Sequence, residues 1–177
     1  MIGRFKRLFH ALRREDGTAA VEFVVAVPLL ITIFMASFES GLLMIRSIML
    51  EQSVDKTMRE LRLGHYPLPD AELLKDEICT RTVIFKDCAA NITIEMTRIS
   101  TANWALPTTG VACIDRSEEI QPVVSLQIGQ QNDIMLVRVC VVQDALFPTT
   151  GIGLGLPKDG HGGYGVITTS AFVTEPT

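Results

Sequence analysis

The sequence lacks the usual patterns that bind metals, nucleotides and nucleic acids. It has no CxxC pair, and its three histidines, His10, His65 and His161, are scattered, which argues against a zinc site. No GK[ST] follows the glycine-rich residues 151–165, so we interpret them as a surface loop. The formal net charge of −4 argues against a nucleic-acid partner, which would need a basic patch.

Catalytic patterns are missing too. We find no Ser/His/Asp set and no paired carboxylates with an assignable geometry. We therefore expect no catalytic residues, no metal and no cofactor. The alternative of a membrane-anchored enzyme would require loss of activity on changing His65 or His161, with folding and assembly intact.

Cysteine is absent from the first 78 residues, and the four cysteines that follow are Cys79, Cys88, Cys113 and Cys140. An even number outside a membrane indicates two disulfides in an oxidising compartment. Three pairings are possible. We favour Cys79–Cys88 with Cys113–Cys140 because the first pair closes the shortest loop; four reduced, buried thiols are the alternative.

A long uncharged run lies near the N-terminus, between Glu22 and Glu39. Its sixteen residues fall short of the roughly 20 that cross a bilayer, but the flanking residues 18–21 and 40–45 supply the length. In a helix the two acids would stand ~26 Å apart, one near each face of the membrane. The sequence therefore predicts a transmembrane helix over about 18–45.

Three residues in or next to this run differ from the rest. Glu22 lies just inside the apolar segment, which costs several kcal/mol unless it is paired, so we interpret it as functional; snorkelling to the interface is the alternative. We expect Glu39 at the outer interface, where the helix emerges into water. Pro28 removes one backbone N–H and should bend the helix modestly.

The charges set the expected orientation. Residues 1–16 carry five basic and two acidic side chains, and the rest of the chain is acidic. Basic residues beside a membrane span stay in the cytoplasm, so the C-terminal body should lie outside.

The apolar pattern continues past Arg46 as one amphipathic face made of Leu50, Val54, Met58 and Leu61. Gly64, Pro67 and Pro69 then end it. We therefore predict one helix over 18–63, about 69 Å long, whose second half leans on a soluble domain.

Residues 64–177 read as a small α+β domain. Asp70 can cap a second helix whose Leu74 and Ile78 face inward. The strand candidates are 91–100, 122–128, 134–142 and 165–174, with residues 129–133 as a hairpin turn between the second and third. We expect the resulting antiparallel sheet to pack on the amphipathic half of the long helix.

The N-terminal order of features resembles the prepilin signal of type IV pilins. A basic leader, residues 1–17, ends in Gly17 and is followed by Thr18-Ala19-Ala20-Val21-Glu22-Phe23 and the apolar run. The resemblance implies a prepilin peptidase that cuts after Gly17, which makes Thr18 the first residue and Glu22 the fifth. A Sec-type signal fits less well because no A-x-A site follows the run.

The wider match, G-T-A-A-V-E-F-V-V-A-V-P-L-L with the later Glu39-Ser40-Gly41, looks like the TadE-like pseudopilins of the tight-adherence (Flp) pilus system. It implies a minor pilin that primes or caps a fibre, with Glu22, Phe23, Pro28 and Glu39 serving assembly and recognition. The implied partners are the peptidase, a second minor pilin, a major Flp-type pilin and a membrane platform with its ATPase. The implied location is the bacterial inner membrane and, on incorporation, the pilus. The variable tail does not decide between the TadE-like and TadF-like subtypes.

The competing hypothesis is an unprocessed, single-pass inner-membrane protein with a periplasmic binding domain. In that case Gly17 and Glu22 should both tolerate replacement by Ala.

Overall fold

The structure is a computed structural model that describes residues 18–67, 69–122, 124–149 and 151–175. The predicted leader, with Gly17 and the cleavage position after it, lies outside the described residues.

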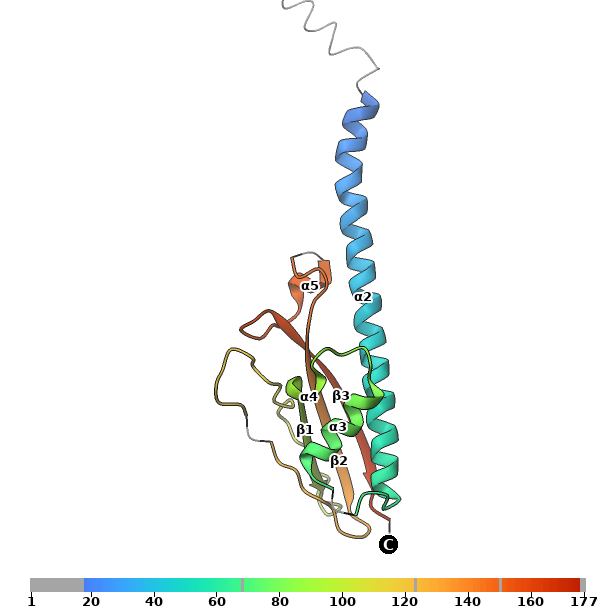
Figure 1. The fold of residues 1–177 in the computed structure, drawn as a ribbon, viewed down its shortest axis with the longest axis vertical. Coiled ribbons are helices and arrows are strands. Elements are labelled where there is room, and N and C mark those ends of the chain that lie inside the picture. The colour runs from blue at the N-terminus through green and yellow to red at the C-terminus, as the bar shows by residue number, and fades with distance from the viewer. Residues whose placement is uncertain (1–17, 68, 123, 150, 176–177) are drawn as a thin grey trace, which may run out of the picture.

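A single helix, α2 (Thr18–Arg62), dominates the molecule (Figure 1). It continues through Pro28, and its last turn carries Arg59 and Arg62, whose charges suit the negative end of the helix dipole. The chain then turns at Gly64, whose φ of 73° is in the left-handed region that glycine adopts without strain. The helix thus ends one residue before the expected Leu63.

The rest of the chain forms short helices and one sheet. In chain order these are α3 (Ala71–Arg81), α4 (Cys88–Asn91), β1 (Ile92–Ile99), β2 (Ile134–Asp144), α5 (Gly151–Gly155) and β3 (Gly163–Val173). The sheet has the order β1-β2-β3, and both neighbouring pairs are antiparallel. This arrangement confirms the predicted α+β class.

Local sequence explains where α3 begins. The side chain of Asp70 accepts a hydrogen bond of 2.8 Å from the backbone N–H of Leu73, which satisfies one of the free donors of the first turn. The apolar side of α3, with buried Leu74 and Ile78, packs in the core with residues of α2 and the sheet.

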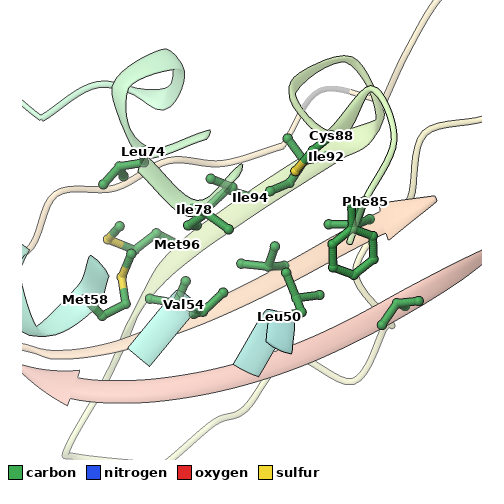
Figure 2. Close-up of a cluster of buried hydrophobic side chains, with 14 of the residues drawn as sticks. Leu50, Val54, Met58, Leu74, Ile78, Phe85, Cys88, Ile92, Ile94 and Met96 are labelled. Carbon is green, nitrogen blue, oxygen red and sulfur yellow. The ribbon is translucent and has the colours of Figure 1, made fainter. Parts of the chain in front are cut away.

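The main core lies between helices α2 and α3 on one side and one face of the sheet on the other (Figure 2). Its members from α2 follow the predicted apolar face, and the strands contribute alternate residues, as expected for a sheet with one covered face. The labelled core residues are Leu50, Val54, Met58, Leu74, Ile78, Phe85, Cys88, Ile92, Ile94 and Met96. The second half of α2 is therefore a core element of the domain.

A smaller cluster of Val111, Cys140 and Val142 covers part of the opposite face of the sheet. The segment that crosses this face is tied down by the disulfide Cys113–Cys140, with a Cα–Cα distance of 5.4 Å. The second disulfide, Cys79–Cys88, joins α3 to α4 with a Cα–Cα distance of 5.6 Å. These are the two pairs that we favour from the sequence.

Two local predictions are wrong. The described residues of 122–128 form no strand of the sheet, and β2 pairs with β1 and β3 instead of closing a hairpin at 129–133. Around Leu126 the chain makes a single parallel bridge to Met96. In addition, part of the expected loop 151–165 folds as α5 and the start of β3.

Candidate assembly surface

The N-terminal half of α2 projects beyond the domain (Figure 1). Most of its large apolar side chains are exposed among the described residues, and Phe34 for example is 70 % exposed. The helix is long and apolar enough to cross a membrane, and its most apolar stretch is not buried in the protein. This half of α2 therefore fits a membrane anchor.

The residues expected to serve assembly lie along this half. Thr18 begins the helix, and Glu22 and Phe23 follow in the next turn with exposed side chains. Pro28 is exposed within the helix. The structure thus presents Glu22 and Phe23 on the outside of α2, where a neighbouring chain can reach them.

Glu39 does not emerge into water, so its predicted environment is wrong. Its carboxylate is fully buried and accepts hydrogen bonds of 3.0 Å from the backbone N–H groups of Leu146 and Phe147. The Phe147 ring also meets the Phe38 ring edge-on, with 6.5 Å between centroids. Glu39 therefore ties α2 to the chain that follows β2, and backbone N–H groups take the place of water around its carboxyl oxygens.

Arg46 makes a second connection about two turns further along α2. Its Nη1 donates to the carbonyl oxygen of Asp144 at 3.0 Å and to the hydroxyl of Tyr164 at 2.5 Å. The guanidinium also stands over the Tyr164 ring, 5.7 Å from its centroid. Together Glu39 and Arg46 hold the anchor helix to the end of the sheet nearest the apolar half.

On another side of α2, Met44, Ile45 and Ile48 form an exposed apolar patch at helical spacing. The patch lies between the apolar half and the core residues that begin at Leu50. It extends the exposed apolar surface of the helix beyond Glu39.

A charged cluster ties the loop before β3 to the segment after Cys113. Arg116 donates to Asp159 and to Asp144, each at 2.7 Å. Burial alone would raise the pKa of Asp159, but the hydrogen bonds from Arg116 and from the N–H of Gly163 lower it to about 2. The same carboxylates raise the pKa of Arg116. The carboxylates are used in structural ion pairs, and among the described residues no group of three or more potential ligands could hold a metal.

Sequence reasoning missed the contacts of Glu39, Arg46 and Asp159. An acidic residue inside an apolar helix, with no basic residue one turn away, indicates a partner in the backbone or in a distant segment. Of the three contacts, that of Glu39 could therefore have been predicted from the sequence. Arg46 and Asp159 pair with residues 118 and 43 positions away, and nothing in their local pattern marks those partners.

Comparison with known proteins gives a match to a family model that covers the N-terminal helix. No curated protein and no solved structure matches the chain significantly. Residues 17–59 match the model of the TadE-like protein family, and they cover nearly all of α2. Through this segment, the chain is similar to TadE-like proteins and consistent with a pilin-type protein of that kind.

Proposed function

We propose that this chain is a minor pilin, or pseudopilin, that primes or caps a tight-adherence type IV pilus after a prepilin peptidase cleaves it behind Gly17. The observation that carries the proposal is the match to the TadE-like model over a helix whose apolar N-terminal half is largely exposed among the described residues. An apolar surface of this length needs lipid before assembly and neighbouring helices afterwards.

The chemistry of the first turns supports this function. Cleavage behind Gly17 creates an α-ammonium at Thr18, and Glu22 offers a carboxylate one turn along. Pairing of these groups between neighbouring chains is attractive in a low-dielectric setting, although desolvation offsets much of the gain. We therefore assign Glu22 to register and recruitment, with the adjacent Phe23 as an apolar contact.

The membrane orientation follows from the charges. The basic residues before Gly17 keep the N-terminus in the cytoplasm, so the disulfide-bonded domain lies in the periplasm. Its partners in this proposal are the peptidase, a second minor pilin, the major Flp-type pilin and the membrane platform. The chain acts as a structural component and not as an enzyme.

The decisive experiment is the intact mass and N-terminal residue of the protein in membranes of its native host. A chain that begins at Thr18 supports the proposal, and a chain that still begins at Met1 with the peptidase active overturns it. Gly17→Ala should leave the chain uncut. Gly41→Ala is the matched control, because a Cβ at Gly41 meets nothing within 4 Å and the chain should still be cut.

Assembly is tested separately from cleavage. Glu22→Ala should be processed normally but should lose co-purification with the partner minor pilin, and Glu22→Asp should retain part of it. Full co-purification by Glu22→Ala would remove the role assigned to this carboxylate.

A further inference from the structure

An uncharged apolar tip stands beside the anchor helix at the end of the domain nearest the membrane. The α5 tip, as we name it, comprises the described residues 145–149 and 151–156, which include α5 and the segment before it (Figure 1). From Ala145 to Pro157 the sequence has no charged residue. The tip exposes Leu146 by 51 %, Ile152 by 40 % and Leu154 by 67 %.

The tip is fixed at one height along α2. Glu39 holds it through the N–H groups of Leu146 and Phe147, and Gly151 lies so close to α2 that a Cβ there would stand 2.5 Å from the Cβ of Ala36. Within the tip, Gly153 packs tightly under Phe147. The tip cannot swing away from α2 without leaving the buried carboxylate unpaired, which is costly.

For a span that begins at Thr18, that height is where the outer edge of a bilayer is expected. From Thr18 to Ala36 a helix rises ~27 Å, close to the ~30 Å thickness of the hydrocarbon core. If the span begins at Thr18, the apolar side chains of the tip meet the lipid at the outer interface. Lys158, whose Nζ donates to the carbonyl oxygen of Pro148 at 2.9 Å, then stands at the level of the phosphate headgroups.

We propose that the α5 tip is a second membrane contact, which docks into the outer interface of the lipid bilayer and sets the outer end of the span near Ala36. This inference rests on the membrane-embedded stage of the proposed function. The same geometry keeps Glu39 out of the lipid, because the tip covers its carboxylate at the point where the helix leaves the bilayer.

Tryptophan fluorescence in vesicles tests this contact, because the chain has a single tryptophan, Trp104. Trp104 follows β1 at the far end of the sheet, since Ile99 pairs with Ile134 and β2 then runs ~34 Å to the tip. Full-length protein would be placed in phosphatidylcholine–phosphatidylglycerol vesicles that carry bromine on the acyl chains. Leu154→Trp and Ile152→Trp would each be made together with Trp104→Phe.

We expect the emission of both tip variants to shift to the blue and to be quenched, most strongly by bromine close to the headgroups. Phe34→Trp in the same background is the positive control for the span, and the native Trp104 is the negative control. Quenching of Phe34→Trp without quenching of either tip variant overturns the second contact but leaves the embedded helix intact. Loss of quenching at Phe34→Trp overturns the embedded stage as well, and quenching of Trp104 overturns the fixed height.

Discussion

The carboxylate of Glu39 accepts a hydrogen bond of 3.0 Å from the backbone N–H of Phe147, a residue 108 positions later in the chain. This contact joins the membrane-type helix to the end of the sheet. Glu39→Ala should remove the carboxylate that accepts from the backbone N–H groups of Leu146 and Phe147 and destabilise this junction by about 2–3 kcal/mol, whereas Glu39→Gln keeps one acceptor and should cost less. Hydrogen exchange of the peptide that contains Leu146 and Phe147 measures the effect, and equal protection in all three proteins would contradict it.

The close approach of Gly151 to α2 predicts a second effect. Gly151 has a φ of 50°, and an added Cβ would collide with Ala36, so Gly151→Ala should weaken the junction by at least about 1–2 kcal/mol. Gly155→Ala is the matched control in the same short helix, because its added Cβ has open space. The thermal unfolding midpoints of both variants in detergent should therefore differ, with only Gly151→Ala lowered.

The disulfides should contribute unequally. Cys113–Cys140 closes a separation of 27 residues and Cys79–Cys88 one of 9, so loop-closure entropy predicts losses of about 3.5 and about 2.6 kcal/mol when each pair is replaced by Ala. Denaturant unfolding of the two double variants gives the comparison. The reverse order would show that strain or residual structure outweighs loop length.

The ion pair between Arg116 and Asp159 predicts a pH-dependent stability. The folded-state pKa of Asp159 is about 2, below its ordinary value of 3.8, so its contribution is complete above about pH 4 and is lost as the pH falls toward 2. The side chain is only 6 % exposed, and the shift corresponds to about 2 kcal/mol.

Asp159→Asn should accordingly unfold more easily than the native protein at pH 7, and the difference should shrink as the pH approaches 2. Unfolding midpoints between pH 7 and 2 test this, with Asp76→Asn on the exposed side of α3 as the control. A difference that is the same at every pH would assign the loss to packing in place of charge.

The exposed patch of Met44, Ile45 and Ile48 predicts an assembly defect that leaves folding intact. Replacing Ile45 and Ile48 by Ser removes apolar area that a neighbouring helix would bury, so the affinity for the partner minor pilin should fall about tenfold or more. Val83→Ser, at an exposed apolar residue outside α2, is the control. Co-purification from membranes measures both, and unchanged recovery of the Ile45/Ile48 variant would exclude this face from the interface.

The long helix and the main elements of the domain were predictable from local patterns. The spacing of Leu50, Val54 and Met58 has the helical period, and the cap at Asp70 acts within its own turn, so both appear in a short window of sequence. The alternation in 91–100 and the β-branched residues of 165–174 likewise predicted β1 and β3.

Partner choice was not predictable in the same way. Residues 122–128 carry a strand-like pattern, but the backbone of Met96 in β1 bonds Ser125 and Gln127 there without forming a strand pair, while β2 takes its neighbours from distant segments. Alternation of apolar and polar residues identifies which face of a strand can be buried, but it does not identify the neighbouring strand in the sheet. The burial of Glu39 was not predictable for the same reason, because its partners Leu146 and Phe147 lie more than 100 positions later in the sequence.

The continuity of α2 has a mechanical consequence. Because the helix enters the core without a linker, any change in its tilt in a bilayer also changes the orientation of the whole domain. A pull on its N-terminal end is transmitted directly to the packed residues around Leu50. Extraction from a membrane would therefore move the apolar half of α2 and the domain together as one rigid body, because no flexible linker separates them within α2.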